Sequence, residues 1–293
     1  MRRILLACAL AIAVAVAPAA HAQSNPKTLL FLTDFGVRDG AVAVCKGVMW
    51  DVLPDLRIVD LTHENPPYDV QTAGEVLEQA VPFYPSGTVA VAVVDPGVGS
   101  ERKPIAIRTR AGHLLVGPDN GMFTLIVDRE GLDRAVELRN VRYFRDARTS
   151  FTFHGRDIFS PVGAHLAAGV PLDSLGPSIT PVRLNVRAAR IASGRVEGTV
   201  RYVEDPYGNV VANVPAALLD SIASMGDSID VMIGTRRLRL PWRSTFSDVK
   251  VGASLVVIHS RGLVSFSVNQ GDFAKRYGIK RGDAVVLRNA SRR

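Results

Sequence analysis

Two carboxylates in this chain directly follow apolar segments that are typical of strands buried on both faces. Asp95 follows Thr88–Val94, in which six consecutive Val and Ala residues succeed the threonine, and a glycine loop then leads to Arg102. Asp34 follows the apolar segment Thr28–Thr33. One such aspartate, taken alone, is ordinarily a turn cap. Two of them at one edge of an open α/β sheet, where ligands bind, indicate a polar pocket instead.

His154 is a third group that could take part in chemistry. It lies beside Gly155, just before a helix that the sequence predicts over Ile158–Ala168. Backbone N–H groups at a helix N-terminus favour negative charge, so a histidine at this place could help to hold an anion. The alternative is a structural histidine that caps the helix.

The elements that must position these groups alternate between strands and helices. Besides the segments above, strands are expected at 56–61, 104–108 and 114–116, and helices at 41–50 and 70–80. This alternation predicts an α/β fold, with a Rossmann-like domain over 27–180 that has a mostly parallel sheet and helices on both faces. Over 186–290, short alternating segments are separated by Gly and Pro, which predicts a small C-terminal β-barrel domain.

The N-terminal segment 1–22 has the pattern of a secretory signal peptide. Two arginines precede the apolar run Ile4–Val16, and Ala20-His21-Ala22 has the small-x-small form of a cleavage site. The run is too short for a transmembrane helix. We therefore expect cleavage after Ala22 and a mature protein that is exported, periplasmic or secreted, and no longer associated with the membrane.

Composition excludes several classes of function. The formal net charge is +7, and removal of the two arginines of the leader leaves +5 (7 − 2). The positive residues are scattered and no basic stripe is paired with aromatic residues, so a nucleic-acid partner is not favoured. Cys45 is the one cysteine left after cleavage, which excludes an internal disulfide. No Cys/His set has zinc spacing and no glycine-rich phosphate loop occurs, so neither a metal nor a cofactor is indicated.

Seven motifs, in order along the mature chain, resemble those of one enzyme family. They are TDFG (33–36), CKGV (45–48), VDPGVGSER (94–102), GPDNG (117–121), TFHGRDIFSPVGAHLAAG (152–169), DPYGN (205–209), and SRG with VNQGD (260–272). With them the chain resembles the S-adenosylmethionine (SAM) hydrolases, or SAM hydroxide adenosyltransferases, whose family also contains fluorinating and chlorinating enzymes. The resemblance implies an α/β domain followed by a β-barrel domain. It also implies a homotrimer whose site lies between the first domain of one subunit and the second domain of its neighbour.

The reaction implied by the resemblance is attack of a water-derived hydroxide on C5′ of the adenosyl group, with methionine as the leaving group and SAM as the substrate. The matching catalytic positions are Asp95, Arg102 and His154. Asp95 would orient Arg102 and His154, which hold the water, with His154 as the preferred proton acceptor. The alternative is that Arg102 favours the hydroxide electrostatically.

The resemblance also implies a set of substrate-binding residues. Asp34 matches the carboxylate that takes both ribose hydroxyls, and Asp39 lies in the loop beside the methionine moiety. Tyr68 and Trp242 are aromatic residues that could stack on the sugar or the adenine, or could be ordinary core aromatics. The remaining expected contacts come from the second domain: Asp205 and Asn209 with the amino-acid part, Ser260 and Arg261 on the methionine side, and the backbone near Gln270 with the adenine edge.

Departures from the halogenating members favour water over halide as the nucleophile. Those members carry Tyr where this chain has Asp95, and a Tyr-Ser pair where it has His154-Gly155. Ala41 stands where one halogenating member has a Ser on the methionine side, which leaves that contact open. Two alternatives remain open. One is an exported protein that binds an adenosyl compound with little turnover, and the other is a SAM-dependent halogenase.

Overall fold

The computed structural model describes residues 27–291. The expected signal peptide and its cleavage site lie outside the described residues. The chain divides between Pro181 and Val182 into two compact units, which are described separately below. No helix in the described part of the chain is long and apolar enough to cross a membrane.

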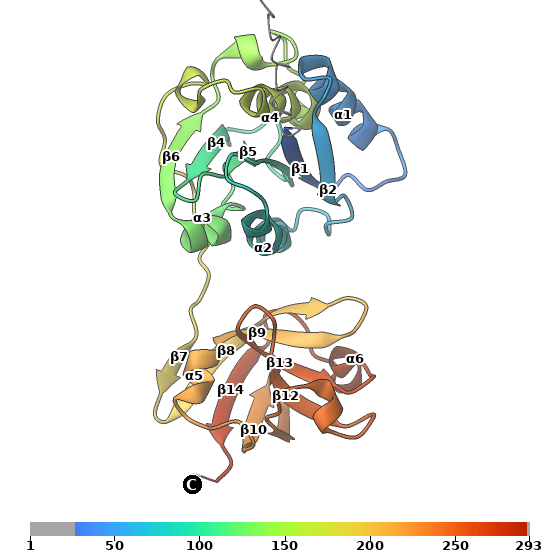
Figure 1. The fold of residues 1–293 in the computed structure, drawn as a ribbon, viewed down its shortest axis with the longest axis vertical. Helices are drawn as coiled ribbons and strands as arrows, with labels where there is room; N and C mark the ends of the chain where they lie inside the picture. The colour runs from blue at the N-terminus through green and yellow to red at the C-terminus, as the bar shows by residue number, and fades with distance from the viewer. Residues whose placement is uncertain (1–26, 292–293) are drawn as a thin grey trace, which may run out of the picture. The chain divides into compact units, whose positions relative to one another are not determined.

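The first unit is built on a six-stranded sheet in the order β2-β1-β3-β5-β4-β6. Strands β2, β1, β3 and β5 are parallel to one another, whereas β4 pairs antiparallel with both β5 and β6 (Figure 1). The expected mostly parallel sheet is therefore confirmed. The bounds are β1 Thr28–Thr33, β2 Arg57–Thr62, β3 Val89–Val93, β4 Pro104–Thr109, β5 Leu114–Pro118 and β6 Leu132–Glu137.

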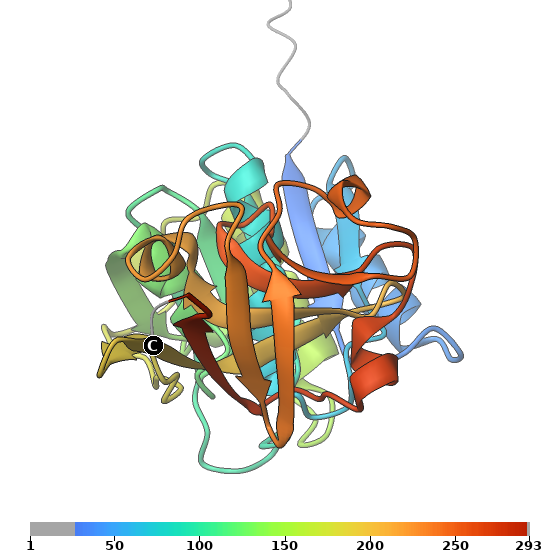
Figure 2. The same ribbon diagram turned by 90° about the horizontal axis from the view of Figure 1, so that it is seen from below.

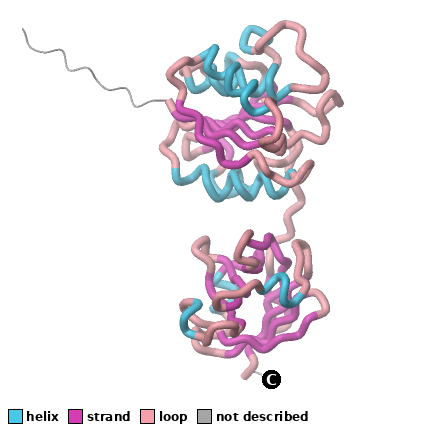
Figure 3. Tube along the Cα trace, turned by 90° about the vertical axis from the view of Figure 1, so that its right-hand side faces the viewer, coloured by secondary structure: helices cyan, strands magenta, loops and turns pink. Residues whose placement is uncertain are grey.

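Helices cover both faces of this sheet, as Figures 1 and 3 show. Because side chains alternate along a strand, Leu29 and Phe31 of β1 pack on one face, with residues of α1 (Ala41–Val52) and α4 (Ser160–Ala167). Leu30 and Leu32 pack on the other face, with residues of α2 (Val70–Ala80) and α3 (Thr124–Glu130). All five residues of β3 are buried, which accounts for its unbroken apolar sequence.

The helix expected over 158–168 begins earlier and in a different form. A π-helical turn over Gly155–Phe159 comes first, and α4 follows it. Gly163 allows α4 to approach the sheet closely, since a Cβ on this residue would lie 2.2 Å from Cγ2 of Val91 in β3. The π-helical turn begins at the residue after His154, so it determines where that side chain stands at the sheet edge.

The second unit is an antiparallel, nearly closed barrel-like sheet, which confirms the predicted fold class. Its strands follow the order β11-β10-β14-β8-β9-β13-β12, with β7 paired to β8, and a bridge between Trp242 and Val256 joins the two ends. In Figure 2 the strands from orange to dark red curve around the core of this unit. Its elements are β7 Arg190–Ala192, β8 Arg195–Glu204, β9 Asn209–Pro215, α5 Ala216–Asp220, β10 Ser228–Ile233, β11 Arg236–Pro241, β12 Ser254–Ile258, β13 Leu263–Val268, α6 Phe273–Tyr277 and β14 Ala284–Asn289.

Candidate functional site

A pocket of about 380 Å³ lies at the edge of the first sheet where β1 and β3 end. Asp34 directly follows β1, and Asp95 lies just after β3, which is parallel to β1. Both carboxylates line the pocket, and so does His154. The walls come mainly from the segments that follow the strands and from the loop before the π-helical turn: Phe35, Pro67, Tyr68, Val93, Val98, Thr152, Phe153 and Gly155. The structure thus brings three residues from distant motifs into one cavity.

The glycine loop after β3 is held against the loop that carries His154. Gly99 has a φ of +77°, and a Cβ on it would lie 2.7 Å from the carbonyl oxygen of Phe151, so no other residue fits this position without a shift. The second loop is in turn tethered to the π-helical turn, because the N–H of Ser150 donates to Asp157 Oδ2 over 2.8 Å. These two constraints set the distance between Arg102 and His154.

Asp95, Arg102 and His154 form one connected set. Arg102 Nε lies 2.9 and 3.0 Å from the two carboxylate oxygens of Asp95, and Arg102 Nη2 donates to Oδ2 of the same group. The same Nη2 lies 2.6 Å from His154 Nδ1. The guanidinium also packs over the ring of Phe159, with 5.3 Å from Cζ to the ring centroid. Arg102 is therefore the central member, since it contacts the other two.

The protonation state of His154 follows from these contacts. An arginine donates hydrogen bonds and accepts none, so Nδ1 of His154 is the acceptor and the neutral ring carries its proton on Nε2. Burial, and next the positive charge of Arg102, lower the pKa of His154 below its ordinary value of 6.5, although Asp95 opposes this. Arg102 Nη1 is buried and has no hydrogen-bond partner among residues 27–291. Arg102 Nη1–H is therefore a donor that this set leaves for a ligand, whereas the ring of His154 also has a backbone contact at Ser150.

Asp34 is held in the same pocket by the backbone of another loop. The N–H of Tyr68 donates to Asp34 Oδ2 over 3.0 Å, and Tyr68 adopts a left-handed φ of +65° to do so. Such a conformation is rare for a bulky residue and points to a functional constraint. Tyr68 lines the pocket and is 72% exposed. Asp39 does not line this pocket; its Oδ1 accepts from Ala41 N–H at the start of α1.

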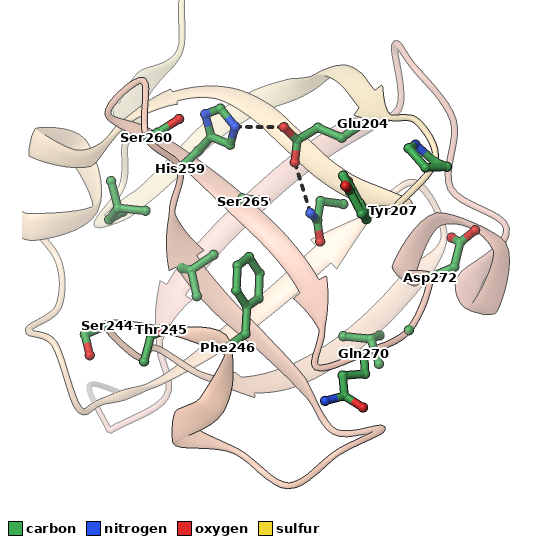
Figure 4. A pocket seen from close by; sticks show the side chains of 16 residues that line it. Glu204, Tyr207, Ser244, Thr245, Phe246, His259, Ser260, Ser265, Gln270 and Asp272 are labelled. Atoms are coloured by element: carbon green, nitrogen blue, oxygen red, sulfur yellow. Dashed lines mark hydrogen bonds and ion pairs between the residues drawn. The ribbon is translucent and has the colours of Figure 1, made fainter.

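The second unit has a pocket of about 760 Å³, shown in Figure 4. Three residues predicted from the sequence line it, namely Asn209, Ser260 and Gln270. Glu204 and His259 also line it and had not been predicted. His259 Nε2 lies 2.9 Å from Glu204 Oε1, and Asn209 Nδ2 donates to Glu204 Oε2 over 3.0 Å (Figure 4).

Glu204 and Asp272 are the carboxylates that line this pocket, whereas the predicted Asp205 is exposed in the turn after β8 and does not line it. A sequence signal for Glu204 existed, because it is the last residue of the strand that leads into the DPYGN turn. His259 likewise directly precedes the predicted Ser260.

Two other predicted residues of the second unit lie outside this pocket. Trp242 is 2% exposed within the hydrophobic core, so its burial supports the ordinary core-aromatic role. The Arg261 guanidinium packs over the ring of Tyr202, at 5.1 Å from the ring centroid, and Arg261 Nη1 donates to the Tyr202 hydroxyl over 3.0 Å. No group of three or more metal-ligating side chains occurs in the part of the chain that the structure describes.

Comparisons with known proteins agree with this architecture. Residues 29–176 match the SAM hydroxide adenosyltransferase N-terminal domain, and residues 198–286 match the C-terminal domain of the same family. A protein of Salinispora arenicola named (R)-S-adenosyl-L-methionine hydrolase is 41% identical, over 87% of this chain and 95% of the relative. A protein of the same name from Thermus thermophilus is 37% identical, over 89% and 99%.

A more distant relative and a solved structure also match over most of the chain. A fluorinase of Actinoplanes sp. is 27% identical over 92% of this chain and 99% of the relative. The crystal structure of an uncharacterized conserved protein from Thermotoga maritima superposes with a TM-score of 0.85 and 36% identity, covering 89% of this chain and 100% of that one. The chain therefore belongs to the SAM hydroxide adenosyltransferase family.

Proposed function

We propose that this chain hydrolyses SAM to adenosine and methionine. The observation that carries the proposal is the connected Asp95–Arg102–His154 set, of which Asp95 and His154 line one pocket together with Asp34. The identity of about 40% with proteins named (R)-S-adenosyl-L-methionine hydrolase supports it. Binding of an adenosyl compound alone would not require a buried, unpartnered arginine donor beside a carboxylate and a histidine.

The reaction needs an oriented nucleophile more than it needs an acid. The oxygen of water bonds to C5′ while the C5′–S bond breaks and the electron pair of that bond goes to sulfur. The water gives one proton to the solvent, and it does so before the attack when the pocket binds the nucleophile as hydroxide. Because the sulfonium becomes a neutral thioether, no proton has to be delivered to the leaving group. A pocket that holds the nucleophile in line and excludes bulk water therefore supplies most of what the reaction requires.

The hydrogen bonds of the set favour stabilisation of hydroxide. For His154 to accept the proton of water at Nδ1, its contact with Arg102 would first have to break. With that contact intact, the unpartnered Arg102 Nη1–H is a donor that can hold a negative oxygen, much as an oxyanion hole does, and His154 Nε2–H can join it by exchanging the backbone contact at Ser150 for the ligand. Asp95 balances the charge of Arg102 and fixes its orientation.

The binding roles extend this proposal. Asp34 accepts hydrogen bonds from the ribose hydroxyls, and Tyr68 lies beside the sugar. In the second unit the Glu204 carboxylate, which accepts from Asn209 and His259, takes the ammonium of the methionine part, with Ser260 and Gln270 as further contacts. We also propose a homotrimer, in which the second unit of one copy completes the pocket of another, and export through cleavage after Ala22. The motifs of the family and the signal-like leader support these two points.

The deciding experiment incubates protein that starts at Gln23 with SAM, in chloride-containing and chloride-free buffer, beside a His154→Ala variant. Adenosine and methionine in both buffers, strongly reduced in the variant, would support hydrolysis. A chlorinated nucleoside would instead establish a halogenase. SAM that is bound and recovered unchanged would establish a binding protein. Light scattering of the same sample would give the oligomeric state.

A further inference from the structure

We propose that His63 and Thr33 are positioning residues that hold the Asp34–Phe35 loop in the geometry that binds the ribose. The proposal rests on the proposed function in one respect, namely that Asp34 is the ribose ligand. Neither His63 nor Thr33 lines the pocket of the first unit. Both are buried, with 6% and 0% of their surfaces exposed.

Three contacts bracket Asp34 in the sequence. His63 Nδ1 lies 2.8 Å from the Thr33 hydroxyl, and the N–H of Phe35 donates to that same hydroxyl oxygen over 3.2 Å. The N–H of Gly36 donates to the carbonyl oxygen of His63 over 2.7 Å. The backbone on both sides of Asp34 is thus tied, directly or through one hydroxyl, to His63.

Charged groups on the far side of His63 set its tautomer. His63 Nε2 lies 3.1 Å from Asp60 Oδ1, a close charged contact that is not aligned as a hydrogen bond, and Lys46 Nζ lies 2.6 Å from Asp60 Oδ2. Burial opposes ionisation of Asp60, but its contacts with Lys46 and His63 hold the pKa of this carboxyl below its ordinary value. A carboxylate beside Nε2 favours the proton on that nitrogen.

The direction of the remaining hydrogen bonds follows. With its proton on Nε2, His63 accepts from the Thr33 hydroxyl at Nδ1, and the same hydroxyl oxygen accepts from Phe35 N–H. The rings of His63 and Phe31 also pack edge to face, with 5.0 Å between the ring centroids. The direction of both hydrogen bonds at Thr33 is therefore defined, and loss of the Thr33 hydroxyl removes the two together.

The position of this loop matters for both halves of the pocket. Phe35 forms part of the wall and packs edge to face on Phe153, with 5.7 Å between the ring centroids. It also fills the space beside Gly155, where a Cβ would lie 2.9 Å from Phe35 Cζ. A shift of the loop would displace the Asp34 carboxylate and the aromatic wall next to His154.

The test compares substitutions that remove or keep single atoms of the tether. Thr33→Val keeps the side-chain shape but removes the hydroxyl, and Thr33→Ser keeps the hydroxyl. His63→Asn keeps a polar atom near the position of Nδ1, whereas His63→Gln keeps one near Nε2. For each variant, calorimetry gives the dissociation constant of adenosine, initial rates give KM and kcat for SAM, and urea titration gives stability.

Thr109→Val is the matched control. Thr109 is also a buried strand threonine, with a hydroxyl that donates to Glu130 over 2.7 Å and accepts from the N–H of His113. It lies at the opposite edge of the sheet from the pocket, because β4 is antiparallel to β5 and Arg108 pairs with Leu114 at the start of that strand. The control therefore has the same kind of stability loss at a place remote from the ligand.

We expect Thr33→Val to weaken adenosine binding and to raise KM by about five- to tenfold with little change in kcat, since the ribose contact is made equally in the ground and transition states. Thr33→Ser should restore binding, and His63→Asn should bind adenosine more tightly than His63→Gln. Thr109→Val should bind adenosine as the wild type does. If Thr33→Val binds adenosine normally, or no worse relative to wild type than Thr109→Val, the proposal is wrong.

The adenosine measurement separates this inference from the proposed function. A wild-type protein that binds adenosine but does not cleave SAM would refute hydrolysis, and the Thr33 and His63 variants would still decide the positioning role. A wild-type protein that binds neither adenosine nor SAM would overturn the inference as well, because Asp34 would then have no ribose to hold.

Discussion

The Asp95–Arg102 pair allows a test that separates stability from catalysis. We predict that the double variant Asp95→Asn/Arg102→Met is destabilised far less than the sum of its two single variants, while all three lose hydrolysis. The side chains of Asp95 and Arg102 are 7% and 9% exposed. Removing one of them leaves the other as an uncompensated buried charge, whereas removing both leaves none.

The expected sizes follow from this burial. Breaking a buried ion pair by removing one partner costs about 3–5 kcal/mol. Simple addition would then give about 6–10 kcal/mol for the double variant, and we expect it to fall short of that sum by at least about 2 kcal/mol. Methionine can keep the apolar contact with Phe159, so the loss of packing at Arg102 is small.

Activity should not recover with stability. Loss of one donor to a developing or stabilised oxyanion lowers kcat by about 10²- to 10³-fold. Arg102 contacts both Asp95 and His154, so its removal leaves the histidine without its orienting partner. Urea unfolding followed by tryptophan fluorescence gives the free energies of unfolding, and chromatography of adenosine gives the rates.

The exposed pair Arg108–Asp133 is the matched control. Both of its side chains are 45% exposed, and the equivalent Met and Asn substitutions should show a coupling below about 1 kcal/mol. If the losses of unfolding free energy in Asp95→Asn and Arg102→Met add up to the loss in the double variant within about 0.5 kcal/mol, the buried-pair reasoning is refuted. A double variant that hydrolyses SAM at the wild-type rate would refute the catalytic assignment.

Three further results are expected. Because the pKa of His154 lies below 6.5, kcat/KM should stay constant as the pH falls to 6.5. It should decrease only at lower pH, where protonation of His154 Nδ1 breaks the contact with Arg102. A midpoint at or above pH 6.5 would contradict this. Asp34→Ala should weaken adenosine binding in calorimetry by about 100-fold, since it removes hydrogen bonds to a charged group, and an unchanged affinity would exclude the ribose role. Burial raises the pKa of the Cys45 thiol to about 11. Iodoacetamide at about pH 8 should therefore label this thiol, in protein that starts at Gln23, only after unfolding in urea. Equal labelling with and without urea, measured by mass spectrometry, would show instead that the thiol is accessible in the folded protein.

Local features of the sequence were sufficient to predict the framework of this protein. The unbroken apolar run of β3 and the helix α2 over Val70–Ala80 were predicted because burial on both faces and a 3.6-residue period are properties of short segments. The shared pocket of Asp34 and Asp95 followed from one more rule, that parallel strands present the same ends to one edge. The barrel of the second unit was likewise predicted from alternating segments and turns.

Tertiary structure alone decided the features that depend on residues far apart in the chain. In the folded second unit Asp205 is exposed, Glu204 contacts His259, 55 residues away, and Trp242 is buried in the core. The tautomer of His154 depends on Arg102, 52 residues earlier, and the tether of Asp34 depends on His63. A sequence pattern records which side chains are apolar and which local conformations are favoured. It does not record which polar atoms meet across the fold, and those contacts determine the proton positions and charges of the site.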